Sequence, residues 1–333
     1  EQAVGMVIAH DLTKIVPGKF KGAAYKKGHV IKEKDVEKLK DMGKSHIYIL
    51  ELSEDEIHED DAAIRMANAF TGQGVYIEGP SEGKISIKAN HRGILKIDVN
   101  TLQAINDIEM VMLSTLHNNT LVEKDQTVAG TRIIPLVTEK KKIEKIEEIC
   151  SKVQSTISIN KIIPKKVGVV VTGSEVYHGR IKDKFGPVLE EKIKEYGGDH
   201  IGTKYAPDSL NEIEDCIESF IDKGAEIILT SGGMSVDPDD ITPSAIRNKS
   251  KTVVTYGSPV LPGAMFMLSY YDDIAIMGIP ACGMYHKTTV LDLVFPRVLT
   301  GERLSRRDIT VLGHGGLCMK CPVCNYPICP FGK

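Results

Sequence analysis

The chain has 333 residues, 42% of them hydrophobic and 26% charged, which is typical of a folded protein with material for more than one core. Its formal net charge of −3 gives no overall attraction to nucleic acid or to an anionic membrane. Its apolar runs are shorter than the roughly 18 residues of a membrane span, and the N-terminus lacks the regions of a signal peptide. We therefore expect a cytoplasmic protein that contacts neither nucleic acid nor membrane.

Residues 1–137 have a mixed pattern that predicts an α+β region. Residues 32–43 and 58–72 have the spacing of short helices, and the second has acids in its first turn and a glycine past its end. Strands are expected at 46–50, 84–89, 94–99, 109–113 and 128–137. Residues 138–165 then predict a connecting helix and linker, with isoleucines at helical spacing followed by a polar stretch.

Residues 166–305 alternate apolar strands with amphipathic helices. Strands are expected at 167–171, 226–233 and 273–280, and helices at 185–198, 209–224 and 285–301. Ser209 and Glu212 have the spacing of a capping box at the start of the second helix. Because the strands are apolar on both faces, the pattern predicts an α/β domain with a parallel sheet covered on both sides. We assign residues 306–333 to a separate C-terminal tail that is rich in cysteine.

The loop "TSGGMSVDPDDITP", residues 230–243, follows one of these strands, where a parallel sheet binds its ligands. Gly232 and Gly233 remove side chains at the strand exit, so that backbone amides can face a phosphate. Thr242 as N-cap and Pro243 in the first turn indicate that the loop ends at a helix N-terminus, which favours anions. The loop therefore predicts a phosphate site.

Asp237, Asp239 and Asp240 are themselves anions within this loop. Carboxylates repel a phosphate unless a cation lies between them, and Mg²⁺ is often bound through one or two carboxylates plus substrate phosphates. The alternative is that the acids only complement the helix dipole. Three acids beside paired glycines favour a metal–phosphate site, with Asp240 and Asp237 as the magnesium ligands.

Three further segments carry weaker signals. In "TGSEVYHGR", residues 172–180, Gly173 lets the backbone turn beside Glu175, although an ordinary loop has the same composition. "GIPACG", residues 278–283, favours a tight turn at a strand exit. Asp208 precedes a helix, where an acid is common without any catalytic role.

Four of the seven cysteines lie in the last sixteen residues, whereas a secreted disulfide framework spreads its cysteines along the chain. Cys318, Cys321, Cys324 and Cys329 have the spacing Cys-x2-Cys-x2-Cys-x4-Cys-Pro, similar to the bacterial ferredoxin run with one extra residue. We expect a [4Fe–4S] cluster here, with structural Zn²⁺ as the alternative. A flexible tail with free thiols is the remaining possibility.

Six segments of the chain, in this order and spacing, resemble the molybdopterin-binding domain of molybdopterin adenylyltransferase, molybdopterin molybdenumtransferase and gephyrin. They are "VVVTGSEV", "FGPVLEEKI", "APDS", "LTSGGMSVDPDDITP", "PVLPG" and "MGIPACG". The resemblance covers about residues 165–300. It implies a three-layer α/β sandwich with a mostly parallel sheet.

The resemblance also assigns site residues. It implies catalytic roles for Asp240, Asp208 and Glu175, with Mg²⁺ held by Asp240. It implies contacts to the pterin ligand from Thr172, Gly173, Ser174, Ser231, Gly232, Gly233, Ser235 and Pro280.

The chain departs from the family pattern at two places. Ala281 and Cys282 stand where the family has Gly-Asn, and a Cβ at Ala281 limits close approach of a ligand. The Pro- and Asp-rich N-terminal segment of the molybdenumtransferases is replaced by a basic segment that contains Lys19, Lys21, Lys26 and Lys27. These lysines favour a solvated loop, with phosphate binding as the alternative.

The resemblance implies a role in molybdenum cofactor biosynthesis, with molybdopterin or its adenylate and an oxyanion as small-molecule ligands. We expect a Mg²⁺-dependent transferase that inserts molybdate, of the molybdenumtransferase type, with the adenylyltransferase type as a variant. The alternative is a non-catalytic module that binds molybdopterin for sensing, storage or delivery. Family members form dimers or trimers, which implies a homo-oligomer.

Overall fold

A computed structural model describes residues 2–9, 11–16, 20–47, 52–235 and 240–333. Asp237, Asp239 and Lys19, to which the sequence analysis gave candidate roles, lie outside these residues, as does most of the strand expected over 46–50. The chain forms two compact units. The first unit comprises Glu1–Asn90, Ile97–Leu116 and Lys124–Ser158, and the second comprises His91–Lys96, His117–Glu123 and Ile159–Lys333.

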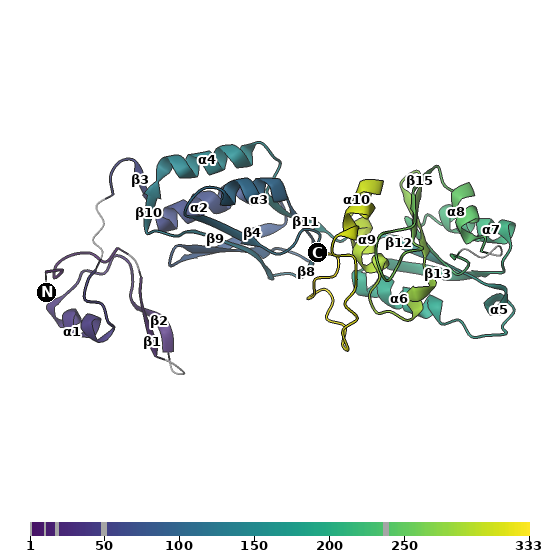
Figure 1. Ribbon diagram of the computed structural model, residues 1–333, viewed down its shortest axis with the longest axis horizontal. Coiled ribbons are helices and arrows are strands. Elements are labelled where there is room, and N and C mark those ends of the chain that lie inside the picture. The colour runs from purple at the N-terminus through teal and green to yellow at the C-terminus, as the bar shows by residue number, and fades with distance from the viewer. Residues whose placement is uncertain (1, 10, 17–19, 48–51, 236–239) are drawn as a thin grey trace. The chain divides into compact units, whose positions relative to one another are not determined.

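The first unit is an α+β structure around a four-stranded antiparallel sheet of order β4-β5-β9-β7 (Figure 1). Its strands are β1 (Leu12–Val16), β2 (Phe20–Tyr25), β3 (Glu56–His58), β4 (Val75–Ser81), β5 (Lys84–Ala89), β7 (Val111–Thr115), β9 (Thr127–Ile133) and β10 (Val137–Glu139). Its helices are α1 (Glu33–Asp41), α2 (Glu59–Phe70), α3 (Val99–Asn106) and α4 (Lys140–Ser151). The two helices expected before residue 72 are confirmed as α1 and α2.

Two differences from expectation in this unit have local causes. The strand expected over 128–137 is two strands, because Pro135 lacks the amide that a continued ladder needs. Strand β4 escaped the sequence analysis because most of its residues are exposed and because Gly79 and Pro80, which are uncommon within strands, lie near its end. Lys27 forms an ion pair with Asp60 at 3.1 Å, and the interpretation of the basic segment as a solvated loop stays a prediction.

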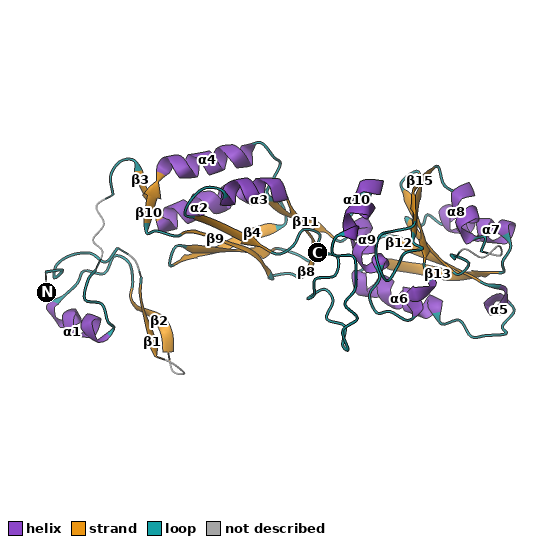
Figure 2. Cartoon of the chain, viewed as in Figure 1, coloured by secondary structure: helices purple, strands orange, loops and turns teal. Residues whose placement is uncertain are grey.

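The second unit is built on a six-stranded sheet of order β13-β12-β14-β17-β16-β15 (Figure 2). The strands are β12 (Lys166–Thr172), β13 (Asp199–Ala206), β14 (Ile227–Ser231), β15 (Thr252–Tyr256), β16 (Met267–Tyr271) and β17 (Ile274–Ile279). The first four in sheet order run parallel, and β16 pairs antiparallel with both β17 and β15. The expectation of an α/β domain with a mostly parallel sheet is therefore confirmed.

The remaining elements of the chain are shorter connections and helices. A three-stranded sheet of order β11-β6-β8 contains β6 (Gly93–Ile97), β8 (Leu121–Val122) and β11 (Ile157–Lys161). The helices are α5 (Ser174–Tyr177), α6 (Phe185–Tyr196), α7 (Leu210–Asp222), α8 (Thr242–Asn248), η1 (Ala281–Met284), α9 (Val290–Leu299), α10 (Arg306–Thr310) and η2 (Val311–Gly313). Within the described residues, no helix has both the length and the apolar character to cross a membrane.

Successive residues of strand β12 belong to two different core clusters. Val169 and Val171 pack with residues of α6 and α9, whereas Val170 packs with residues of α7 and α8. Since side chains alternate across a strand, each cluster lies on its own face of the sheet. This division explains why the strand is apolar at every position from Val167 to Val171.

Two local expectations about helix starts are wrong. Ser209 precedes α7 as its N-cap, but its side chain makes no cap hydrogen bond to a described residue, so there is no capping box. Helix α8 begins at Thr242 itself, with Ile241 as the N-cap. The Thr242 hydroxyl is instead hydrogen bonded to the Thr172 hydroxyl at 3.1 Å, a partner that local sequence does not reveal.

The end of the chain packs into the second unit. Phe331 is only 3% exposed and belongs to the same core cluster as α6 and α9. The Tyr326 hydroxyl donates a hydrogen bond to the carbonyl oxygen of Asp292 in α9 at 3.0 Å. The tail that the sequence analysis separated from the α/β domain therefore shares its core.

Replacing Phe331 with alanine is expected to lower the free energy of unfolding by about 3–5 kcal/mol, because it leaves a cavity in this core. Ile328→Ala is the matched control, since Ile328 lies in the same tail and is 89% exposed. The control should change the free energy by less than about 0.5 kcal/mol. Denaturant unfolding followed by circular dichroism measures both. Equal stabilities would show that the tail is not packed in the core.

Candidate functional site

Two adjoining cavities lie at the carboxyl ends of β12, β14 and β17. Cavity A has a volume of about 580 Å³ and cavity B of about 390 Å³. Gly232 and Ala281 line both, so the two cavities meet at these residues. Both volumes lie in the range of roughly 300–1,000 Å³ that is usual for small-molecule sites. The position is the one at which open α/β sheets bind ligands.

Most of the site residues expected from the sequence line these cavities. Cavity A is lined by Gly232, Gly233, Ser235, Asp240 and Pro280. Cavity B is lined by Thr172, Glu175, Ser231 and Gly232. Gly173, Ser174 and Asp208 line neither cavity.

The paired glycines are required by the packing of the loop on strand β12. Gly232 has φ +91°, and a Cβ placed on it would lie 2.2 Å from the carbonyl oxygen of Thr172. Gly233 has φ +51°, and a Cβ there would lie 2.8 Å from Oγ1 of Thr242. Both conformations also disfavour any other L-residue. The packing alone thus explains why both positions are glycine, without a bound phosphate.

The Thr172 hydroxyl joins the three elements that meet at the cavities. It donates a hydrogen bond to the carbonyl oxygen of Ser231 at 3.1 Å and is bonded to the Thr242 hydroxyl, also at 3.1 Å. All three residues are buried. The ends of β12 and β14 and the start of α8 are therefore held together by one buried hydroxyl.

The Ser231 hydroxyl is buried in the wall of cavity B and has no hydrogen-bond partner among the residues that the structure describes. An unsatisfied buried hydroxyl costs about 1–3 kcal/mol, so buried polar groups normally find partners. Ser231, which the sequence analysis had selected, thus carries a buried hydroxyl beside cavity B that has no partner among the described residues.

Tyr256, which the sequence analysis missed, holds the two residues that follow the glycine pair; we call Ser231–Ser235 the glycine loop. Its hydroxyl lies 3.3 Å from the carbonyl oxygen of Met234 and 3.2 Å from that of Ser235, and donates to this pair. Burial raises the pKa of the Tyr256 phenol, and the negative charge of Asp240 raises the pKa further. The phenol therefore keeps its proton and remains a donor.

Asp208 holds the loop that follows β12. Its carboxylate accepts a hydrogen bond from the amide of Ser174 at 2.9 Å, and its own amide donates to the Ser174 hydroxyl at 3.1 Å. The Gly173 amide donates to the carbonyl oxygen of Ala206 at 3.1 Å. This geometry favours a positioning role for Asp208 over the catalytic role that the resemblance implied.

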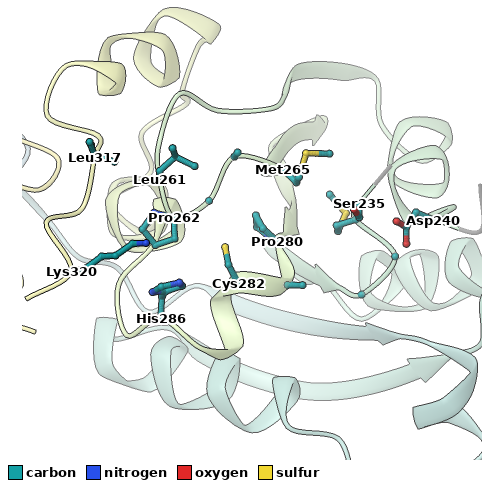
Figure 3. Close-up of a pocket in the computed structure, with 16 residues that line it drawn as sticks. Ser235, Asp240, Leu261, Pro262, Met265, Pro280, Cys282, His286, Leu317 and Lys320 are labelled. Atoms are coloured by element: carbon teal, nitrogen blue, oxygen red, sulfur yellow. The ribbon is translucent and has the colours of Figure 1, made fainter. Parts of the chain in front are cut away.

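Several residues of cavity A were not expected from the sequence. They are Cys282, His286, Leu317 and Lys320, together with the loop from Leu261 to Met265 (Figure 3). Burial raises the pKa of the Cys282 thiol, so this cysteine stays neutral at ordinary pH. Leu317 and Lys320 belong to the C-terminal tail, which therefore forms part of the wall of cavity A.

The four tail cysteines do not form a metal centre in this structure. In the part of the chain that the structure describes, no group of three or more His, Cys, Asp or Glu side chains is placed to hold a metal ion. Cys318 and Cys329 pack against the core, and Cys324 Sγ lies 3.3 Å from the Thr288 hydroxyl. The arrangement does not support an iron–sulfur cluster or Zn²⁺, and either metal stays a prediction.

Comparison with protein families finds two matches. Residues 168–300 match a family described as a probable molybdopterin binding domain. Residues 1–51 match a family described as a domain of unknown function.

Curated relatives share a shorter stretch. A CinA-like protein of Mycobacterium avium (strain 104) is 34% identical over 80 residues, which is 24% of this chain and 18% of the relative. A CinA-like protein of Mycolicibacterium gilvum (strain PYR-GCK) is 36% identical over 77 residues, 23% of this chain and 18% of the relative. The chain thus covers less than a fifth of the length of these relatives.

Solved structures of similar proteins include the molybdopterin biosynthesis enzyme MoaB of Thermus thermophilus. It is 20% identical, with a TM-score of 0.37, and the match covers 41% of this chain and 98% of that one. The protein CinA of Thermoplasma acidophilum is 14% identical, with a TM-score of 0.32, over 36% of this chain and 89% of that one.

Gly232→Ala is expected to destabilise the protein by about 1–3 kcal/mol more than Gly224→Ala, because only the first Cβ overlaps another atom. Gly224 is a matched control: its φ is +73° and a Cβ there would meet nothing within 4 Å. The control variant should carry only the strain of a left-handed alanine, about 1–2 kcal/mol. Urea unfolding of both variants measures the difference. Equal losses would mean that Gly232 does not lie against Thr172.

Proposed function

Residues 168–300 of this chain form a domain of the probable molybdopterin-binding family, and from that premise we propose that the protein acts in molybdenum cofactor biosynthesis. It binds molybdopterin or its adenylate across cavities A and B and promotes the insertion of molybdate, as a transferase of the molybdenumtransferase type. The packing of helices on both faces of the sheet supports a three-layer arrangement of this domain.

The observation that carries the proposal is the pair of cavities that meet at Gly232 and Ala281. A ligand with a fused-ring body and a phosphate tail needs two connected spaces, one mainly apolar and one polar. Cavity A has a largely apolar wall with the Asp240 carboxylate at one side. Cavity B is lined by polar residues, among them Thr172, Glu175 and Asp183. The two together fit such a ligand, with the glycine loop between its parts.

Asp240 fits the expected Mg²⁺ because a magnesium site needs one or two protein carboxylates, the other ligands coming from substrate phosphate and water. The Asp240 carboxylate is half-buried and lines cavity A. Bound Mg²⁺ would neutralise phosphate charge and polarise the phosphoryl group. Asp237, the second ligand expected from the sequence, lies outside the described residues.

The chain's own contribution is to position the ligand. The Thr172 hydroxyl and the Tyr256 phenol hold the glycine loop from both sides, so that the backbone between them is fixed before a ligand arrives. A fixed loop does not have to reorganise during the reaction, and this preorganisation lowers the barrier for phosphoryl chemistry.

A non-catalytic binding module is the second candidate, and Ala281 and Cys282 favour it. Ala281 lines both cavities, so its side chain stands at the place where they meet. The resemblance puts glycine there. A narrower passage hinders a ligand that must cross from one cavity to the other, whereas it allows a pterin to bind in cavity A alone.

The proposal is tested by Asp240→Asn in the full chain, purified without oxygen and given adenylated molybdopterin, Mg²⁺ and molybdate. AMP release is expected to fall on the order of 100-fold, because the carboxylate that holds the cation is lost. Pterin binding, measured by fluorescence, should change less than about threefold. Asp215→Asn, an acid on α7 outside both cavities, is the control with the same loss of charge.

Equal AMP release by the two variants would exclude the role of Asp240. Wild-type protein that binds the adenylate but never releases AMP would instead establish the binding module. Protein that binds no pterin in either form would overturn the proposed function as a whole.

A further inference from the structure

The C-terminal tail lies along one side of cavity A. The amide of Leu261 donates to the carbonyl oxygen of Gly316 at 2.8 Å, and the amide of Cys318 donates to the carbonyl oxygen of Leu261 at 2.8 Å. Leu261 and Leu317 form a parallel bridge between these bonds. The tail thus pairs with the cavity loop as a short added strand, and its next residues extend over the cavity.

The path of the tail is held on both sides of this pairing. A Cβ on Gly316 would lie 2.3 Å from the carbonyl oxygen of Leu312, so the tail passes too close to η2 for any other residue there. Further on, the amide of Gly332 donates to the carbonyl oxygen of Gly315 at 3.0 Å, and Phe331 is buried in the core. The tail is anchored before and after the residues that reach cavity A.

Lys320 is the charged residue that the tail brings to cavity A. Its φ is +52°, a left-handed conformation that glycine or asparagine adopts more easily than lysine. In Figure 3 the Lys320 side chain points from the tail toward Pro262. The hydrogen bonds and ion pairs among the described residues do not include its Nζ, so its ammonium group is available to a ligand.

His286 also lines cavity A, and Figure 3 shows it, like Lys320, on the side of the cavity away from Asp240. The amide of His286 donates to the carbonyl oxygen of Cys282 at 3.0 Å, which holds the residue at the end of η1. An ammonium group and an imidazole can together donate several hydrogen bonds to the oxygens of one anion.

We propose that Lys320 and His286 form a subsite for a tetrahedral oxyanion in cavity A. The inference rests on the proposed function and names the end of the site at which the oxyanion substrate binds. Asp240 repels a dianion unless a cation is present, whereas Lys320 attracts one directly. Molybdate is therefore expected at the Lys320 side, and the phosphate of the pterin at the Asp240 side.

The test is isothermal titration of the full chain with sodium molybdate, and separately with inorganic phosphate, in the absence of pterin. Lys320→Gln is expected to weaken molybdate binding about tenfold or more, because a charge-assisted hydrogen bond is lost. Lys320→Arg should retain most of the affinity, and His286→Gln should weaken it as well. Lys223→Gln, an exposed lysine after α7 with the same change of charge, should leave it unchanged.

Each result separates the subsite from the proposed function. A Lys320→Gln variant that binds both molybdate and phosphate as tightly as the wild type overturns the subsite, and so does wild-type protein that binds no oxyanion either alone or with molybdopterin present. A tenfold loss that is seen only for phosphate supports the oxyanion subsite and assigns it to the phosphate of the ligand. A loss for molybdate in a protein that binds no pterin keeps the subsite and rejects the proposed function.

Discussion

The candidate site depends on one close approach, in which the backbone of Gly232 lies so near Thr172 that no side chain fits between them. The same threonine hydroxyl binds the end of β14 and the start of α8. These buried contacts restrain Gly232 and Gly233 at the exit of β14. Cavities A and B meet beside Gly232.

The charges around cavity A are divided between two sources. Asp240 belongs to the domain that matches the molybdopterin-binding family, whereas Lys320 belongs to the tail outside the matched residues. In Figure 3 the two lie on different sides of the cavity. A cavity with an acid at one side and a base at the other offers two unlike positions to an anion, because the acid requires a bridging cation and the base does not. The tail thereby contributes a positive charge to a cavity whose negative charge comes from the family domain.

Most residues that the sequence patterns selected line cavities A and B, but the structure gives some of them a task other than the expected one. The glycine pair was attributed to a phosphate, but its packing against Thr172 and Thr242 already requires it. Asp208 was expected to be catalytic, and its hydrogen bonds to Ser174 give it a structural task. Both residue types suit either purpose. Only the positions of neighbouring atoms show whether a residue holds a loop or contacts a ligand.

The sequence by itself determined the mostly parallel sheet of the second unit and selected the glycine pair that lies beside cavities A and B. Strands that are apolar at every position have no polar face to expose, and glycines at a strand exit mark a close approach of backbone. The composition of the cavities was decided by tertiary structure. Tyr256, His286 and Lys320 reach the site from segments far apart along the chain, and the tail does so through backbone hydrogen bonds to Leu261. Such bonds join groups that every residue carries, so no pattern of side chains predicts which backbones will pair.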